Sequence, residues 1–248
     1  MLLKVNIIGL IIALMFIHPV FAIDQIFDRS LIRNECVVLL HGLARSSSSF
    51  TKMEKALTAE DYTVVNVAYP SRHHAIEVLA NQYVGSAIKQ CHSHQLKRIH
   101  FVTHSMGGIS IRYYLANHKL SSLGRIVMLS PPNKGSEIVD KLGDFPGFHA
   151  LNGPAGQQLG ASKESLPNRL KPIDYPVGII TGNRSINLIL SLLIPGDDDG
   201  KVSIQNAKLA GMTDFLVVPH IHPMIMRSEE VIRQSMYFLQ HALFDKRK

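Results

Sequence analysis

Thr103-His104-Ser105-Met106-Gly107-Gly108 is the most informative segment of the chain, because it indicates both the type of fold and a reactive side chain. The apolar run 99–103 that leads into it predicts a strand, and the pattern over 106–117 that follows predicts a helix. A serine between a strand and a helix stands on a sharp turn with its hydroxyl pointing off the sheet, and the two glycines after it relieve crowding. The free amides at the start of the helix then face the place where negative charge would develop. This context predicts that Ser105 is a nucleophile. Thr103 stands where the usual G-x-S-x-G pattern has its first glycine.

On both sides of this turn, short apolar runs alternate with helical patterns along the chain. The alternation predicts an α/β fold, with a mostly parallel central sheet of about six strands and helices on both faces. The expected strands are 36–40, 63–68, 99–103, 125–130, 176–181 and 214–218. The expected helices are 47–60, 75–91, 106–117 and 228–243.

Two stretches break this alternation. Residues 131–172 are rich in Pro, Gly, Asn and Ser and show no clean helical period, and 186–194 is an almost unbroken apolar run. Long irregular insertions in a compact domain are commonly functional loops or lids. We therefore expect one domain over 23–248 with a lid or cap insertion in 131–172 and 186–195. The alternative for the apolar run is a helix packed on the core.

The first 22 residues predict a secretory signal peptide. Lys4 is followed by the apolar stretch 5–17, and Val20 and Ala22 occupy the −3 and −1 positions of a cut after residue 22. The expected location of the mature protein is therefore secreted or periplasmic. The alternative is an uncleaved membrane anchor, for which the apolar stretch is short.

Composition excludes several classes of protein. With 46% hydrophobic and 18% charged residues, the 248-residue chain is too apolar for a disordered protein. The formal charge of +7 suits transient contact with an anionic membrane surface, but ordinary solubility is the preferred explanation. No Lys/Arg-rich helix or nucleic-acid motif is found, so no nucleic-acid partner is expected. The oligomeric state stays open.

The two cysteines, Cys36 and Cys91, can form one disulfide at most. Because Cys36 falls in a predicted buried strand, we expect a free thiol there. Neighbouring histidines such as His92 and His94 lack cysteine partners and helical i, i+4 spacing, so no metal site is expected. No cofactor is expected either.

A second signal, His41-Gly42-Leu43, directly follows the first expected strand. The carboxyl ends of parallel strands share one edge of the sheet, so this loop should face the Ser105 turn. The backbone amides of Leu43 and Met106 can then form an oxyanion hole. The alternative is a simple strand-ending turn with a packed histidine.

A serine hydroxyl needs a base to act as a nucleophile, and the base needs an acidic residue to orient it. Acid candidates lie in 195–200, which contains three adjacent aspartates. That cluster could also be a solvated turn or part of a calcium site. The base candidates are His220 and His222, which follow the last expected strand.

These motifs together resemble small bacterial lipases and esterases of the α/β-hydrolase fold. The resemblance rests on the His41 loop, the Ser105 turn, the stretch Ser130-Pro131-Pro132-Asn133-Lys134-Gly135-Ser136 and the late Asp…His order, and it covers roughly residues 34–244. It implies that Ser105, Asp199 and His222 are nucleophile, orienting acid and base. Asp198 and His220 are the reserve candidates.

The resemblance implies a serine hydrolase that cleaves carboxylic esters, with acyl lipids as the expected substrates. Two other classes fit the same residues. One is an amidase, thioesterase or acyltransferase on the same fold, because a fold does not fix a reaction. The other is a non-catalytic member of the fold that binds a lipid or a protein.

Overall fold

The computed structural model describes residues 33–186 and 191–247. Within them, six parallel strands form one sheet in the order β2-β1-β3-β4-β5-β6. The prediction of a mostly parallel sheet of about six strands is confirmed, and each predicted strand end lies within two residues of the observed one. The strands are β1 (Glu35–Leu40), β2 (Thr63–Val67), β3 (Arg98–His104), β4 (Leu123–Leu129), β5 (Val177–Gly182) and β6 (Asp214–Val218).

Side chains alternate between the two faces of this sheet. In β1, Val37 and Leu39 belong to one apolar cluster, whereas Val38 and Leu40 belong to the other. Both clusters are buried, which is why the strand reads as a continuous apolar run rather than an alternating one.

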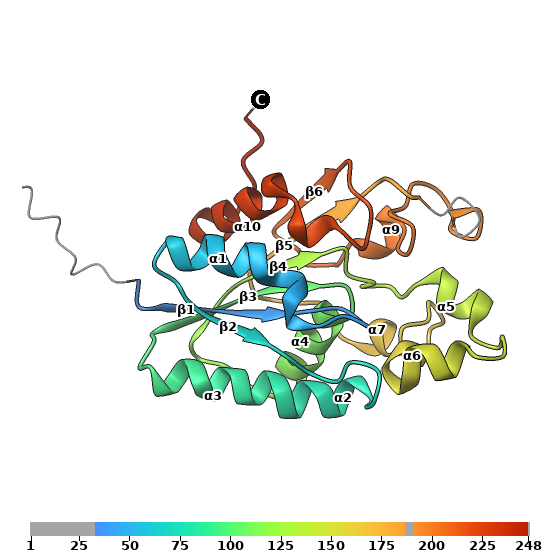
Figure 1. Cartoon of the computed structure of the whole chain (residues 1–248), viewed down its shortest axis with the longest axis horizontal. Helices are drawn as coiled ribbons and strands as arrows, with labels where there is room; N and C mark the ends of the chain where they lie inside the picture. Colours follow the sequence, from blue (N-terminus) through green and yellow to red (C-terminus); the bar gives the residue numbers. More distant parts are fainter. Residues whose placement is uncertain (1–32, 187–190, 248) are drawn as a thin grey trace, which may run out of the picture. The chain divides into compact units, whose positions relative to one another are not determined.

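Helices cover both faces of the sheet, as predicted (Figure 1). One face is covered by α1 and α10, and the opposite face by α2, α3 and α4. The expected helix 75–91 is continuous but contains a π-helical turn at Ala80–Val84. The bounds are α1 (Thr51–Ala59), α2 (Ile76–Leu79), α3 (Gly85–Ser93), α4 (Met106–Asn117) and α10 (Glu229–His241), with 3₁₀ turns at Ser47–Phe50 and Ile225–Arg227.

The stretch 131–172, expected to be irregular, contains three short helices. These are α5 (Glu137–Leu142), α6 (Phe148–Gln157) and α7 (Leu166–Arg169). They lie beyond the carboxyl ends of the strands (Figure 1). The sequence shows no helical period here because the helices are short and because α6 bends at Gly153, where φ is 63° and Pro154 follows.

The second insertion is only partly visible, because 187–190 lie outside the described residues. On either side of them Ile186 and Leu192 are exposed, whereas Ile194 is buried. The lid therefore stays a prediction. A further short helix, α9 (Ile204–Ala207), follows this insertion.

The predicted signal peptide 1–22 also lies outside the described residues. In the part of the chain that is described, no helix is both long and apolar enough to cross a membrane.

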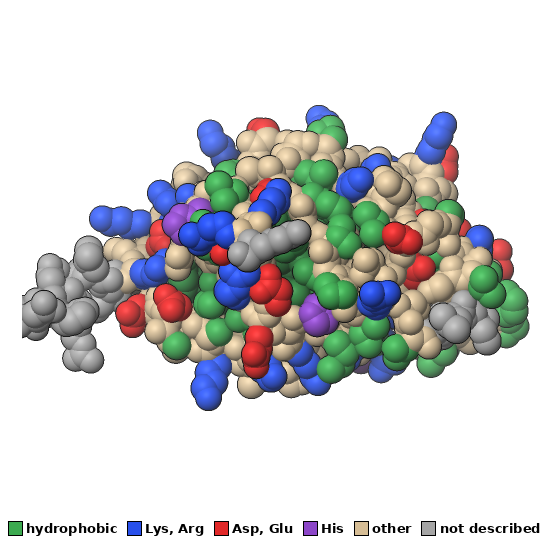
Figure 2. Space-filling view, turned by 90° about the horizontal axis from the view of Figure 1, so that it is seen from above, with side chains coloured by type: hydrophobic (Ala, Val, Ile, Leu, Met, Phe, Trp, Pro, Cys, Tyr) green, Lys and Arg blue, Asp and Glu red, His purple; other side chains and the backbone are tan. Residues whose placement is uncertain are grey.

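On the face seen in Figure 2, Lys and Arg side chains are spread among Asp and Glu side chains.

The expectation of a free thiol at Cys36 is wrong. Cys36 is bonded to Cys91, and their Cα atoms are 5.9 Å apart. The physical reason is that α3 packs on the face of β1 toward which Cys36 points, which brings the two fully buried sulfur atoms together. The burial of Cys36 in β1 is compatible with a disulfide, because its partner Cys91 is buried in α3, which packs on that strand.

Candidate active site

Ser105 lies between β3 and α4 in a backbone conformation that a non-glycine residue rarely adopts, with φ 52° and ψ −121°. The conformation is held from both sides. The Ser105 amide donates to the Leu129 carbonyl at 2.9 Å, and the Gly108 amide donates to the Ser105 carbonyl at 2.9 Å. The predicted sharp strand-to-helix turn is therefore present, and it presents Ser105 at the carboxyl edge of the sheet.

The two glycines after Met106 make this turn possible. A Cβ atom on Gly107 would lie 2.4 Å from the Leu40 carbonyl oxygen, so α4 can only pass β1 if this position has no side chain. A Cβ atom on Gly108 would lie 3.4 Å from the Thr103 Oγ1 and 3.1 Å from the Pro131 Cβ. Thr103, fully buried, fits its unusual position because Gly108 leaves it room.

The loop after β1 lies directly against the Ser105 turn, as the shared edge of the sheet predicts. A Cβ atom on Gly42 would lie 3.1 Å from the Ser105 Cβ and 2.9 Å from the His104 Nδ1. The strand order reverses at β1, whose neighbours are β2 and β3. Crevices for ligands form at such a reversal, outside the carboxyl ends of the strands.

The His41 ring fixes this loop. Its Nδ1 donates to the Gly42 carbonyl at 2.9 Å, and its Nε2 accepts the Tyr69 amide at 3.4 Å. The ring also stacks on Tyr69, with centroids 3.9 Å apart, and Tyr69 donates its hydroxyl to the His41 carbonyl. Burial lowers the pKa of His41, so the ring is neutral. The His41 ring is therefore a packed structural histidine, as the alternative interpretation of this motif expected. The loop that carries it nevertheless lies against the Ser105 turn.

Asp199 and His222, far apart in the sequence, are hydrogen bonded. The His222 Nδ1 donates to the Asp199 Oδ2 at 2.8 Å, and both side chains are buried. The other carboxylate oxygen, Oδ1, accepts the amides of Lys201 at 3.1 Å and Val202 at 2.9 Å. Burial on its own would raise the pKa of Asp199, but the charge and hydrogen bond of His222, together with the Val202 amide, lower it. The carboxylate is therefore ionised and holds the imidazole in one orientation.

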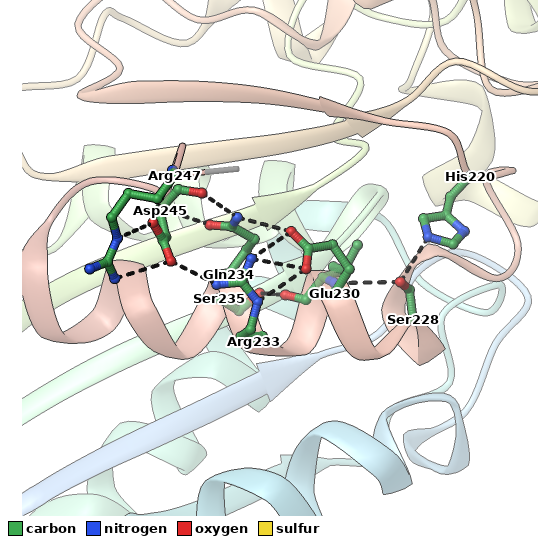
Figure 3. A network of polar contacts seen from close by, with 9 residues as sticks. His220, Ser228, Glu230, Arg233, Gln234, Ser235, Asp245 and Arg247 are labelled. Carbon is green, nitrogen blue, oxygen red and sulfur yellow. Dashed lines mark hydrogen bonds and ion pairs between the residues drawn. The ribbon is translucent and has the colours of Figure 1, made fainter.

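The reserve candidates are engaged elsewhere. The Asp198 Oδ1 accepts the Ser191 hydroxyl at 2.9 Å and the Gly200 amide at 2.6 Å, which makes it part of the turn that carries Asp199. The His220 Nε2 lies 2.8 Å from the hydroxyl of Ser228, the residue that caps α10, at the end of a polar network along that helix (Figure 3). Neither side chain is paired with His222.

A residue that the sequence did not single out, His104, touches the Asp199–His222 pair. Its Nε2 donates to the His222 carbonyl at 3.0 Å, and the centroids of the two rings are 4.8 Å apart. Burial, and then the charge of His222, hold the pKa of His104 well below its usual value. The only signal in the sequence was its place beside Ser105.

Ser105 and His222 line one cavity of about 280 Å³, together with Leu43. Met106 opens α4, so its amide is among those without an acceptor inside the helix. The two expected oxyanion donors thus lie in the loop after β1 and at the start of α4. The cavity wall also includes residues of 131–172, namely Pro132, Ser136, Ile138, Val139, Phe148, Asn152, Gly156 and Leu159.

Two basic side chains, Arg45 and Lys201, also line this cavity. Burial, and then the positive charge of Arg45, lower the pKa of Lys201. Neither residue was singled out in the sequence. Among the described residues, no group of three or more His, Cys, Asp or Glu side chains could hold a metal ion.

A parallel sheet with a serine on a strained strand-to-helix turn defines the α/β-hydrolase class of folds. The profile of the alpha/beta hydrolase family matches residues 37–203, which is more than half of the chain. The chain therefore belongs to the alpha/beta hydrolase family, and this membership supports hydrolase chemistry. No curated protein sequence matches the chain.

Solved structures of lipolytic enzymes share this fold. The mature form of the Bacillus licheniformis lipase BlEst2 is 18% identical, with a TM-score of 0.67, and the match covers 82% of this chain and 91% of that one. The propeptide form of the same lipase is 19% identical, with a TM-score of 0.69, and the match covers 86% of this chain and 51% of that one. The phospholipase PlaB from Legionella pneumophila is 17% identical, with a TM-score of 0.65, and the match covers 84% of this chain and 59% of that one. The chain thus spans little more than half of these two longer proteins, and at such identities the likeness is one of fold.

Proposed function

We propose that the protein is a serine hydrolase that cleaves carboxylic esters, with acyl lipids as substrates. The observation that carries the proposal is the buried hydrogen bond between Asp199 and His222, in a cavity that His222 shares with Ser105. In this proposal Ser105 is the nucleophile, His222 the base and Asp199 the residue that orients the base.

Acylation begins when the His222 Nε2 takes the proton of the Ser105 hydroxyl. The Ser105 Oγ then bonds to the carbonyl carbon of the ester, and the carbonyl oxygen becomes an oxyanion that the amides of Leu43 and Met106 stabilise. Asp199 stabilises the imidazolium. As the tetrahedral intermediate collapses, the bond to the alcohol breaks and the proton passes from His222 to the departing oxygen.

Deacylation repeats these steps with water. His222 removes a proton from a water molecule, whose oxygen attacks the acyl carbon on Ser105. The bond between that carbon and the Ser105 Oγ breaks, and His222 returns the proton to the serine. The products are the free acid and the unchanged enzyme, so no cofactor is consumed.

Acyl lipids are favoured as substrates by the walls of the cavity. Apolar side chains of the 131–172 stretch, Ile138, Val139, Phe148 and Leu159, line it beside Ser105. Burying an acyl chain against such walls stabilises binding by about 0.8 kcal/mol for each methylene group. Esters with longer chains should therefore bind more tightly until the cavity is full. Transient contact with a lipid surface would supply such substrates.

Secretion or periplasmic location is part of the proposal. The N-terminal pattern over 1–22 supports it, and so does the Cys36–Cys91 disulfide, because disulfides persist in oxidising compartments. Sequencing the N-terminus of the exported protein tests this: a first residue of Ile23 is expected, and a retained N-terminus supports the anchor instead.

A fluorophosphonate probe tests the nucleophile. It should label the folded protein at Ser105, and Ser105→Ala should abolish both labelling and ester turnover, lowering the rate by roughly a millionfold. Rates on matched ester, thioester and amide substrates separate an esterase from the other enzymes of this fold. A folded protein that takes up no label and cleaves none of the three is the non-catalytic binder.

A further inference from the structure

A second cavity, of about 430 Å³, lies next to the one that contains Ser105, and the two share Ala44 and Arg45. Its walls come from the loop after β1, the 3₁₀ turn at Ser47–Phe50, the loop after β2 and Arg227 at the end of another 3₁₀ turn. Segments far apart in the sequence therefore meet beside the proposed catalytic serine.

The lining of this second cavity is basic. It contains the guanidinium groups of Arg45, Arg72 and Arg227 and the His73 ring, and none of its described lining residues is Asp or Glu. Among the ion pairs formed within 33–186 and 191–247, none includes any of these three arginines. In the described part of the chain, no carboxylate therefore forms an ion pair with these three guanidinium groups.

Neutral groups hold two of the arginines in place. Arg45 donates from Nη2 to the Pro223 carbonyl at 3.3 Å, and Arg72 donates from Nη1 to the Leu151 carbonyl at 3.4 Å. A carbonyl orients a guanidinium group but leaves its charge and its other N–H groups available to an anion.

Hydroxyl groups add further donors to this cavity. Ser71 is buried, and its Oγ accepts the Ala44 amide at 3.0 Å, so its own hydrogen can be donated. Ser46 and Ser48 also line the cavity. Several arginines with serine hydroxyls form the donor set that suits the oxygens of a phosphate group.

We propose that this second cavity binds the phosphate group of a phosphorylated ester substrate while the ester carbonyl lies at Ser105. Arg45 lines both cavities, so a short alcohol portion can connect a phosphate in one with an acyl group in the other. The substrate class is an acyl ester whose alcohol carries a phosphate monoester, such as an acylated glycerol phosphate. This inference rests on the proposed function and narrows its substrate.

The test compares 1-hexanoylglycerol 3-phosphate with 1-hexanoylglycerol, which differ only in the phosphate. The protein should have a kcat/KM at least about tenfold higher for the phosphorylated ester, since charge-assisted hydrogen bonds favour it. Arg72→Ala and Arg227→Ala should each lower this ratio by about tenfold, and Arg227→Lys should lower it less. Arg233→Ala, an exposed arginine of α10 outside both cavities, should not change the ratio.

Calorimetry on the Ser105→Ala protein measures binding without turnover. Glycerol 3-phosphate and inorganic phosphate should both bind, more weakly in Arg72→Ala, and both should compete with the phosphorylated ester. Phosphate that binds without competing identifies a site for the free ion and overturns the inference.

The two proposals fail in different ways. If both esters are cleaved at equal rates and the arginine variants change nothing, the phosphate site is wrong and the esterase stands. If neither ester is cleaved but glycerol 3-phosphate binds and Arg72→Ala weakens it, the phosphate site stands and the esterase is wrong.

Discussion

The His104 Nε2 donates a hydrogen bond to the backbone carbonyl of His222 at 3.0 Å. Because a carbonyl only accepts, the proton of the neutral His104 ring is on Nε2, and Nδ1 is bare. The His222 amide donates to the Asp199 carbonyl at 2.9 Å, and its side chain is bonded to the Asp199 carboxylate. His222 is thus held at its amide, carbonyl and ring, and one of these three contacts comes from the residue next to Ser105.

Replacing His104 should therefore impair turnover through the position of His222. His104→Phe removes the hydrogen bond that holds the His222 carbonyl, so the imidazole is less well positioned and kcat should fall by about tenfold to a hundredfold while KM changes little. His104→Gln can donate from its side-chain amide near the position of Nε2 and should recover part of kcat. Steady-state kinetics on a short-chain ester gives both constants. Equal losses for the two variants would show that the hydrogen bond is not what matters.

The neighbouring aspartates provide a matched pair of variants. In Asp199→Asn, the new amide would donate to the His222 Nδ1 and place the ring proton on Nε2, which could then no longer accept a proton from Ser105. We expect kcat to fall by about ten-thousandfold. Asp198→Asn keeps an oxygen for the Ser191 and Gly200 contacts and should lose less than about tenfold in kcat. A larger effect at Asp198 would contradict the proposed roles.

The parts of this site that could be predicted from the sequence are those whose residues lie close together in the chain. The strand, the Ser105 turn and the two glycines lie within a dozen residues, and they predicted the element types and the sharp turn. His222 and Asp199 were predicted only alongside reserve candidates, because nothing local distinguishes Asp199 from the aspartates before it or His222 from His220. What separates them is contact over a long sequence distance: Asp199 meets His222, whereas His220 meets Ser228.

Arg45, Arg72 and Arg227 illustrate the limit of such prediction. Each belongs to a different loop or turn, and no spacing in the chain connects them, so only the folded structure gathers them at one cavity. The same holds for Cys36 and Cys91, whose pairing depends on how α3 lies over β1. Features confined to one element could be predicted, and so could the meeting of two loops at the shared edge of the sheet. Contacts that depend on how helices and loops pack on one another could not.

The buried His100 predicts a dependence of stability on pH. Burial, partly opposed by Glu35, lowers the pKa of His100 to about 4, whereas the unfolded chain titrates near the ordinary value of about 6.5. Between these two values the unfolded state binds a proton that the folded state does not. The free energy of unfolding should therefore fall with falling pH, by up to about 1.4 kcal/mol per pH unit from this residue.

Denaturant unfolding between about pH 7 and pH 4.5 measures this slope. His100→Asn keeps an acceptor for the Arg125 amide, which lies 2.9 Å from the His100 Nδ1, and should reduce the slope. His94→Asn, at an exposed histidine, should leave the slope unchanged. If the wild type and His100→Asn lose stability in parallel over this range, His100 is not the group responsible.

The disulfide should contribute substantially to stability, because it joins β1 to α3 across a separation of 55 residues. A bridge of that span restricts the unfolded chain strongly, and its removal should lower the free energy of unfolding by about 2–4 kcal/mol. The double variant Cys36→Ala/Cys91→Ala measures this loss in denaturant unfolding, and reduction of the wild-type protein should produce a similar loss. Because the bridge lies on the α3 side of the sheet and outside the cavity of Ser105, kcat of the folded variant should stay within about twofold of the wild type. A variant as stable as the wild type would contradict the expected contribution of the bridge.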